Sequence, residues 1–386
     1  MRARATTPVP VEGRGSGPVG VGLIGAGMIS EQYLANLVKC PDVRVVVVGD
    51  IDPDRARAKA EVYGVEWGTP DDVLGHPDVE LIVNITIPQS HAEVSMAAIG
   101  AGKHVWSEKP LTTRRETARA LLYAAEHAGL LVGVAPDTGY GPGLQTARRI
   151  IARGDIGTPL SAQTAIQYPG PNLFHPNPEF LFATGAGPLF DIGPYYLTAL
   201  VHLFGPFSYV AAVGSTGHAT RTIATGPRAG AQFGVSVPTH VSAIAQFAGG
   251  AVSQSLISFD SPLSRIQFEV TGTEATLSVP DPNKFGGTVK ITPTVGREGI
   301  DAEPVWTEIA GEEERFGRGA GVVDMARRIR NGGTPIASGA VGFHVLDVMA
   351  SMAESMRTHE MVAITSTVDE VPMLPEGWDP YEQTIF

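Results

Sequence analysis

The sequence has very little cysteine, no long apolar run and no excess of basic residues. Cys40 is the single cysteine among 386 residues, so neither an internal disulfide nor a thiolate zinc cluster can form. No stretch of about 20 apolar residues is present, and no membrane-spanning helix is expected. The 28 Lys and Arg residues against 40 Asp and Glu residues give a net charge of −12. This balance argues against a nucleic-acid partner and against binding to an anionic membrane surface.

The first 17 residues differ in composition from the rest of the chain. They are rich in Arg, Pro, Gly and Thr and have no apolar centre, so they do not resemble a secretory signal. We expect a disordered leader over residues 1–17 and, given the single cysteine, a cytoplasmic protein. A hydrophobic fraction of 43% is typical of a globular chain, and the length predicts two or three domains.

Strand and helix patterns alternate up to about residue 138. Asp52, which is followed by a proline, is typical of a helix start. Ser90 and Thr113 each stand three residues before a glutamate, which predicts two capping boxes. The alternation predicts an α/β fold, in which residues 18–138 form an N-terminal dinucleotide-binding Rossmann domain with a doubly wound parallel sheet. Its strands are expected over 19–24, 43–48, 81–86, 104–107 and 130–135.

The pattern changes after this domain. Apolar residues alternate on both sides of Gly249-Gly250, which predicts a β-hairpin over 241–248 and 252–259. We expect residues 139–386 to form one C-terminal α+β domain, for substrate binding and oligomerisation, with a large and mostly antiparallel sheet. Further strands are expected over 266–271 and 275–279, and helices over 144–153, 188–204 with a kink at Gly193-Pro194, 322–330 and 341–357.

A glycine-rich turn follows the first predicted strand and opens a helix. In Gly25-Ala26-Gly27, the first glycine permits a tight turn and the second lets a pyrophosphate approach the backbone. Asp50 ends the second predicted strand, 20 residues beyond Ser30, where a carboxylate accepts hydrogen bonds from an adenosine ribose. The same carboxylate repels a 2′-phosphate, so the sequence predicts NAD as the cofactor, with NADP disfavoured.

Three further motifs occur in the order and spacing of one known family. They are the strand-end triplet Glu108-Lys109-Pro110, the segment Thr86-Ile87-Pro88 with His91, and the run from Gly185 to Gly193. With the glycine turn, they make the chain resemble the Gfo/Idh/MocA family of sugar and polyol oxidoreductases. The resemblance covers nearly the whole chain from Val19.

The resemblance implies that Lys109 lies beside the nicotinamide and the substrate hydroxyl. A lysine at the carboxyl edge of a parallel sheet faces the ligand crevice, where desolvation lowers its pKa toward the working pH and makes it useful for proton transfer. The alternative is a surface lysine paired with Glu108. The resemblance also implies a cis peptide bond before Pro110 in many members.

The next family motif, Asp-x-Gly-x-His, begins here at Asp191 but ends in Tyr195 instead of histidine. This departure matters because tyrosine does not titrate near neutrality without help. We interpret Lys109 and Tyr195 as sharing the proton transfer, with Asp191 orienting them or the substrate hydroxyl. The alternatives are that Tyr195 is an aromatic residue of a packed helix and that Asp191 caps a helix end.

Two further residues are candidates on the substrate side. His175 lies in a proline-rich loop before Asp191 and could bind a sugar hydroxyl, or it could be structural. Asp137 follows the last parallel strand, where a turn-capping role is the alternative. No His, Cys, Asp and Glu residues stand at the short spacings of a metal site, so no metal is expected.

The sequence therefore predicts an NAD-dependent dehydrogenase that moves a hydride between a sugar, polyol or glycoside and nicotinamide. Two alternatives stay open: a glycosidase or lyase that recycles its NAD, and a non-catalytic NAD- or sugar-sensing regulator. Oligomerisation, as a homodimer or homotetramer, is implied by the resemblance, because family members often pair through the open face of the antiparallel sheet. The full set of expected cofactor-binding residues is Gly25, Gly27, Met28, Ile29, Asp50, Ile51, Thr86, Pro88, His91, Glu108 and Lys109.

Overall fold

The computed structural model describes residues 13, 15–294, 299 and 301–386, so most of the expected leader lies outside the described residues. The chain divides into two compact units. The parallel-sheet unit holds the described residues up to Gly141 together with 313–346 and 371–386, and the nine-strand unit holds 142–312 and 347–370. The second unit is thus not the continuous segment 139–386 expected from the sequence, because two late segments pack with the first unit.

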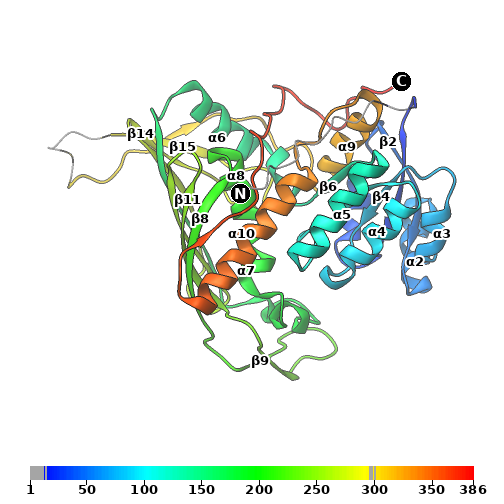
Figure 1. Ribbon diagram of the computed structural model, residues 1–386, viewed down its shortest axis with the longest axis horizontal. Helices are drawn as coiled ribbons and strands as arrows, with labels where there is room; N and C mark the ends of the chain where they lie inside the picture. Colours follow the sequence, from blue (N-terminus) through cyan, green and yellow to red (C-terminus); the bar gives the residue numbers. More distant parts are fainter. Residues whose placement is uncertain (1–12, 14, 295–298, 300) are drawn as a thin grey trace. The chain divides into compact units, whose positions relative to one another are not determined.

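The parallel-sheet unit is built on six parallel strands in the order β3-β2-β1-β4-β5-β6 (Figure 1, blue and cyan). This is the doubly wound Rossmann arrangement predicted from the alternating pattern. The strands are β1 (Val19–Ile24), β2 (Val43–Gly49), β3 (Glu66–Gly68), β4 (Leu81–Asn84), β5 (His104–Ser107) and β6 (Val132–Val134). The helices are α1 (Ser30–Leu37), α2 (Pro53–Tyr63), α3 (Pro70–Gly75), α4 (His91–Gly100), α5 (Arg115–Ala128) and, from the late segment, α9 (Ala320–Asn331).

Helix ends in this unit follow the sequence only in part. The Asp52 side chain accepts a hydrogen bond from the Asp54 N–H and caps α2 as predicted. The capping box expected at Ser90 is wrong, because this residue makes no side-chain cap bond. The box expected at Thr113 is wrong as well, since α5 begins at Arg115 after a different N-cap residue.

The nine-strand unit contains one large mixed sheet in the order β16-β15-β14-β13-β7-β12-β11-β8-β17. Within it only β12 and β7 pair in parallel, so the predicted, mostly antiparallel sheet is confirmed. The strands are β7 (Pro159–Gln167), β8 (Phe207–Ser215), β11 (His240–Phe247), β12 (Val252–Ser258), β13 (Arg265–Gly272), β14 (Ala275–Ser278), β15 (Val289–Pro293), β16 (Thr307–Ile309) and β17 (Val362–Ala363).

Helices and a small separate sheet complete this unit. The predicted kink near Gly193 is a full break at Ile192, which separates two helices. A two-stranded sheet lies in the chain between β8 and β11. The helices are α6 (Pro142–Arg153), α7 (Gly187–Asp191), α8 (Gly193–Phe204) and α10 (Gly339–Thr358), within which the division between the units falls, and the two strands are β9 (Thr220–Thr222) and β10 (Gln232–Gly234).

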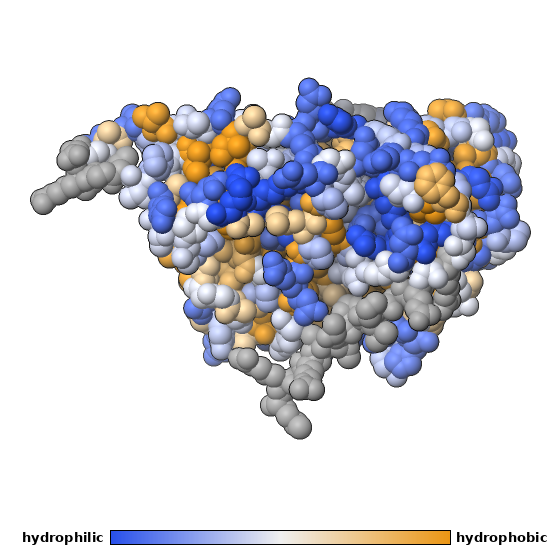
Figure 2. Space-filling view, turned by 90° about the horizontal axis from the view of Figure 1, so that it is seen from above, coloured by the Kyte–Doolittle hydropathy of each residue, from blue (hydrophilic) through white to orange (hydrophobic). Residues whose placement is uncertain are grey.

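The two faces of the large sheet differ in burial. Along β11, Val241, Ala243 and Phe247 are buried, whereas Ile244 between them is 51% exposed. On the neighbouring strand β8, Val213 is 64% exposed. The exposed face is hollowed by a depression of about 620 Å³, which Ile244 and Val213 help to line. Seen from above, the surface of the molecule carries orange apolar side chains among blue polar ones (Figure 2). An antiparallel sheet with one solvated face matches the expected open-faced architecture.

No helix within the described ranges is long and apolar enough to cross a membrane. Likewise, the described residues contain no group of three His, Cys, Asp or Glu side chains that could hold a metal ion.

Candidate functional site

The glycine turn between β1 and α1 is shaped by close backbone approach. Gly25 has φ of +112°, and a Cβ atom there would lie 2.7 Å from the carbonyl oxygen of Ile85. Only glycine fits such a position. Gly27 is the opposite case, because a Cβ atom there would meet nothing within 4 Å. The turn therefore leaves open space over its second glycine, next to the N-terminus of α1, which suits a phosphate group.

Asp50 follows the last residue of β2 and ties that strand to the glycine turn. One carboxylate oxygen accepts a hydrogen bond from the Ala26 N–H at 2.6 Å, and the other accepts from the Asp52 N–H at 2.9 Å. Each oxygen retains a second lone pair for a ligand hydroxyl. Three apolar side chains beside these strand ends are exposed to solvent: Met28 is 71% exposed, Ile51 92% and Ile87 55%.

The Glu108-Lys109-Pro110 triplet directly follows β5 and is held by a buried chain of hydrogen bonds. The Trp106 indole N–H donates to the Tyr33 hydroxyl at 3.1 Å, and that hydroxyl donates to Glu108 at 2.9 Å. The second Glu108 oxygen accepts from the Lys109 backbone N–H at 3.0 Å. Burial and the nearby Glu108 charge raise the pKa of Tyr33, so the phenol remains a donor. The Lys109–Pro110 peptide bond is cis, and the lysine is half-buried.

His91 joins the ends of two parallel strands from within the core. Its Nδ1 lies 2.7 Å from the Pro110 carbonyl oxygen and its Nε2 lies 3.1 Å from the Thr86 carbonyl oxygen. The ring is fully buried, and burial lowers its pKa. This placement differs from the direct cofactor contact expected from the sequence. His91 instead fixes the backbone on which Thr86 and Lys109 stand.

Asp137 has a structural place in the parallel-sheet unit. Its carboxylate is fully buried, accepts hydrogen bonds from the backbone N–H groups of Gly319 at 2.7 Å and Gly321 at 3.4 Å, and pairs with Arg318 at 3.4 Å. Burial raises its pKa in spite of these partners. The carboxylate thus caps the start of α9, and no part of it is exposed to receive a substrate, in contrast to the role expected from the sequence.

The nine-strand unit brings His175, Tyr168 and Asp191 together. Asp191 is the last residue of α7 and is half-buried, and its charge acts on both other side chains. Burial and this charge raise the pKa of Tyr168, which keeps its hydroxyl protonated. Partial burial lowers the pKa of His175, although the negative charge of Asp191 acts to raise it. The His175 Nδ1 accepts the Asn177 N–H at 3.0 Å, which leaves Nε2 to carry the proton of the neutral ring.

Tyr195 lies in the first turn of α8, four residues after Asp191, and only 8% of it is exposed. Lys109 belongs to the parallel-sheet unit, whereas Tyr195, His175 and Asp191 belong to the nine-strand unit. The short helix α7 starts at Gly187, whose φ is +81° and where a Cβ atom would lie 3.0 Å from Val237. This close approach and the positive φ explain the glycine at position 187, and a positive φ of +85° explains Gly185.

Sequence reasoning missed Tyr33 and Tyr168. Tyr33 is a buried residue of α1, and nothing in the neighbouring sequence indicates a hydrogen bond to a glutamate 75 residues away. Tyr168 follows β7, a strand that was not predicted. Had β7 been predicted, Tyr168 would have stood directly after a strand, as Asp50 does after β2.

Comparison with known proteins identifies the relatives. The model of the oxidoreductase family with an NAD-binding Rossmann fold, GFO_IDH_MocA, matches residues 19–135, and that of the GFO/IDH/MocA C-terminal domain matches residues 144–278. The chain belongs to this family. The first match contains the glycine turn, Asp50 and the Glu108–Pro110 triplet, and the second contains Asp191. The chain is thus an oxidoreductase with an NAD-binding Rossmann domain.

Individual members of the family are similar to this chain at 24% to 28% identity for those named here. The 1,5-anhydro-D-fructose reductase of Ensifer adhaerens is 28% identical over 266 residues, which are 66% of this chain and 74% of the reductase. The levoglucosan dehydrogenase of Pseudarthrobacter phenanthrenivorans is 28% identical over 284 residues, 67% of this chain and 72% of that enzyme. A levoglucosan dehydrogenase solved with NADH and L-sorbose shares the fold, with a TM-score of 0.76 at 24% identity over 90% of this chain and 99% of that one.

Proposed function

We propose that this protein moves a hydride between a carbinol carbon of a sugar, polyol or glycoside and the nicotinamide of NAD. The observation that carries the proposal is the Glu108-Lys109-Pro110 triplet, which is fixed by buried hydrogen bonds at the carboxyl end of β5 in a family of NAD-binding oxidoreductases. Ligands of doubly wound sheets bind at this edge. The named relatives, an anhydrofructose reductase and a levoglucosan dehydrogenase, act on carbohydrates, which supports the substrate class.

The described residues fit NAD. We assign the pyrophosphate to the turn at Gly25 and Gly27, where open space adjoins helix N–H groups. Asp50 accepts hydrogen bonds from the adenosine ribose and disfavours the 2′-phosphate of NADP. The remaining cofactor contacts are assigned to Met28, Ile29, Ile51, Thr86, Pro88, Glu108 and Lys109, with His91 acting through the backbone of its neighbours.

Bound NAD supplies the hydride acceptor, and side chains of this chain handle the proton. We assign the substrate hydroxyl proton to Lys109 and Tyr195, with Asp191 orienting the hydroxyl, as the family motifs imply. His175 binds a neighbouring hydroxyl through its Nε2, because its Nδ1 is already occupied by the Asn177 N–H. Asp137 has no role in this scheme, since its carboxylate is buried under α9.

The test is to incubate the purified protein with NAD and a panel of free sugars, polyols and glycosides. NADH and cleavage products are followed together, with Lys109→Ala as the inactive variant. NADH formation that is lost in the variant supports the dehydrogenase. Cleavage without NADH would replace it by an NAD-recycling glycosidase or lyase. NAD binding with neither product would favour a sensing regulator.

We also propose that two or four copies of the chain assemble through the exposed face of the nine-stranded sheet. Ile244 and Val213 leave apolar surface on that face, at 51% and 64% exposure. Burying such surface between copies is favourable by about 25 cal/mol per Å². Ile244→Asp should convert the oligomer to monomers on a sizing column, and a wild-type protein that elutes as a monomer would refute the proposal.

A further inference from the structure

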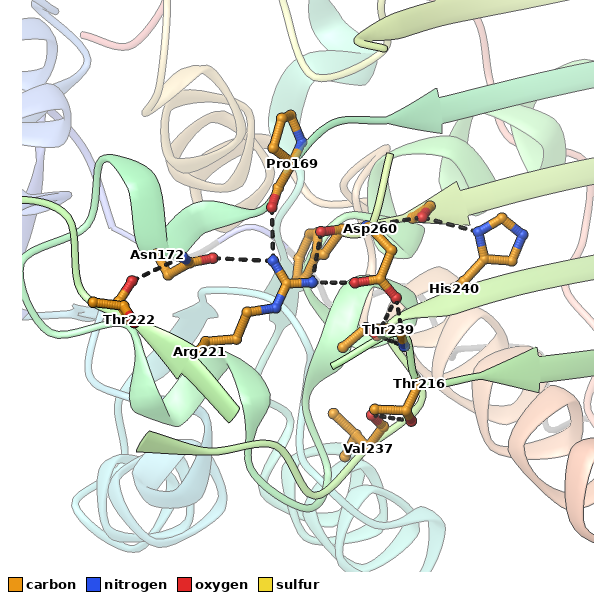
Figure 3. Close-up of polar contacts among 12 residues, drawn as sticks. Pro169, Asn172, Thr216, Arg221, Thr222, Val237, Thr239, His240 and Asp260 are labelled. Atoms are coloured by element: carbon orange, nitrogen blue, oxygen red, sulfur yellow. Dashed lines mark hydrogen bonds and ion pairs between the residues drawn. The ribbon is translucent and has the colours of Figure 1, made fainter. Parts of the chain in front are cut away.

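Arg221, at the centre of β9, binds several separate segments of the nine-strand unit with one guanidinium group (Figure 3). Its Nη1 donates to the Pro169 carbonyl oxygen at 2.7 Å and lies 3.4 Å from the Asn172 side-chain oxygen. Its Nη2 donates to the Phe259 carbonyl oxygen at 2.9 Å and pairs with Asp260. The side chain is 8% exposed, so these contacts are shielded from water.

Asp260 is itself fixed by neighbours. The carboxylate oxygen that does not face Arg221 accepts hydrogen bonds from the Thr239 hydroxyl and from the Gly217 backbone N–H, the latter at 3.0 Å. The Asp260 N–H donates to the Ser258 hydroxyl at 3.0 Å. The anion therefore cannot move toward or away from the guanidinium without breaking several bonds, and it holds Arg221 in one position.

Arg221 belongs to residues 216–239, a segment that we call the excursion and that lies outside the large sheet. β8 and β11 are antiparallel neighbours, and a short hairpin turn could join them. The chain instead runs out through residues 216–239 and forms the β9–β10 sheet. A second tie fixes this excursion, because the Asn172 side chain donates to the Thr222 carbonyl and the Asn172 carbonyl accepts from the Ala224 N–H, both at 2.9 Å.

The segment bound by the excursion is the loop over residues 168–175. Gly170 within it has φ of +112°, and a Cβ atom there would lie 3.0 Å from the Arg221 Nη1. The guanidinium thus packs directly on the loop backbone. Tyr168 and His175 stand at the two ends of this loop, and both lie within the field of Asp191.

Stability alone does not account for this arrangement. A buried ion pair is often replaceable by apolar residues without loss of stability, because desolvation offsets the attraction. The planar guanidinium instead defines the directions of its acceptors, here two carbonyls, one amide oxygen and one carboxylate. Arg221 therefore fixes the position of the loop that bears Tyr168 and His175.

We propose that Arg221 is a positioning residue for sugar recognition, and that Tyr168 joins His175 in contacting the hydroxyl groups of the substrate. By holding the loop at Pro169 and Asn172, Arg221 keeps the Tyr168 phenol and the His175 imidazole beside Asp191. The proposal rests on the proposed function. It makes the excursion over residues 216–239 a determinant of which sugar epimer is accepted, because Arg221 acts through the loop that it holds.

The experiment compares Arg221→Met with Arg228→Met. Arg228 lies in the same excursion and pairs with Glu179 on the surface, with 53% of its side chain exposed, so it is a matched control. Three quantities are measured for each variant: hydrogen exchange of peptides covering 168–175, the KM and kcat for the sugar, and the Kd for NAD without sugar.

We expect Arg221→Met to speed exchange in 168–175 and to raise the sugar KM at least tenfold with a smaller change in kcat. The ratio of kcat/KM between epimeric sugars should move toward one. The NAD Kd should not change, because the glycine turn lies in the other unit. Arg228→Met should match the wild type. Tyr168→Phe should raise the sugar KM without altering exchange.

Unchanged exchange and KM in a folded Arg221→Met protein would overturn the proposal. If that variant does not fold, Asn172→Ala decides, because it removes the side-chain bonds of Asn172 to Thr222 and to Arg221 and leaves the ion pair between Arg221 and Asp260 in place. It should give the same changes at a smaller size. A wild-type protein that turns over no sugar would refute the proposed function and the sugar role of Arg221 together, whereas altered exchange with an unaltered KM would refute only the sugar role.

Discussion

The two units hold their candidate residues by different means. In the parallel-sheet unit, Gly25, Asp50 and Glu108 each directly follow the last residue of a strand, so the backbone of the sheet places them. In the nine-strand unit, the loop with His175 is fixed by Arg221, whose partners stand 38 to 52 positions away in the sequence. A sheet edge positions side chains through local geometry, whereas a loop requires bonds from a distant side chain.

The comparison predicts different kinetic effects for the two units, and the largest belongs to Lys109. Lys109→Ala should lower kcat by about 10²- to 10⁴-fold, the range typical of a lost proton-transfer group, while NAD still binds. Steady-state kinetics with the best sugar of the panel and an NAD titration check this. Lys39→Ala, which removes an exposed lysine of the same unit, is the control. A Lys109→Ala variant with a raised KM and a normal kcat would contradict the assignment of Lys109 to proton transfer.

Asp137→Ala should be the most damaging change to the fold of the parallel-sheet unit. It removes the carboxylate partner of Arg318, whose side chain is 9% exposed, and breaking a buried pair in this way costs about 3–5 kcal/mol. Urea unfolding measures the loss. Asp78→Ala, which breaks the exposed pair with Arg44, should cost less than about 1 kcal/mol. A raised sugar KM with normal stability would instead make Asp137 a substrate residue.

His202 should make the nine-strand unit sensitive to acid. Neither of its ring nitrogens has a hydrogen-bond partner in the described part of the chain, and burial, with the nearby Arg148 charge, lowers its pKa to about 3. The unfolded chain takes up the proton near pH 6.5 and the folded chain only near pH 3, so acidification favours unfolding across this window. From pH 7 to pH 5 this group removes about 2 kcal/mol of unfolding free energy.

Urea unfolding at both pH values tests this prediction. His202→Phe should show a smaller loss of stability between pH 7 and pH 5 than the wild type, by about 2 kcal/mol. His218→Gln, at an exposed histidine of the same unit, should lose as much as the wild type. Equal losses in the wild type and His202→Phe would contradict the assignment.

Asp50→Asn should have the smallest effect of the series. The amide keeps one acceptor for the glycine turn but loses the charge that we assign to the ribose, so the NAD Kd should rise by about tenfold, or about 1.4 kcal/mol. NADP binding should improve at the same time because the repulsion of its phosphate is removed. Titration with both cofactors checks the ratio, and an unchanged ratio would exclude Asp50 as the discriminating residue.

The sequence was most informative where function follows a strand. Five of the six strands of the parallel sheet, all but β3, were predicted, as were the β11–β12 hairpin and the strand-end positions of Asp50 and Lys109. Each of these depends on a pattern within about ten residues. β7 and β8 were not predicted, and Tyr168, which directly follows β7, was therefore missed. Arg221 could not be found either, since a single arginine in a three-residue strand has no local pattern. The structural partners of Asp137 were not foreseen because they lie 181 to 184 residues later in the sequence.

The late segments of the parallel-sheet unit have a consequence for the order of events on the ribosome. Asp42, fully buried after α1, accepts hydrogen bonds from the backbone N–H groups of Thr384 at 2.9 Å and Ile385 at 3.0 Å. The strands of this unit are therefore translated first and its last polar contacts are translated last. At about 5–20 residues per second, the nascent unit waits tens of seconds, while the whole nine-strand unit is synthesised, before it can close. During that time the buried Asp42 carboxylate lacks these partners, and incomplete units of this kind are what chaperones bind.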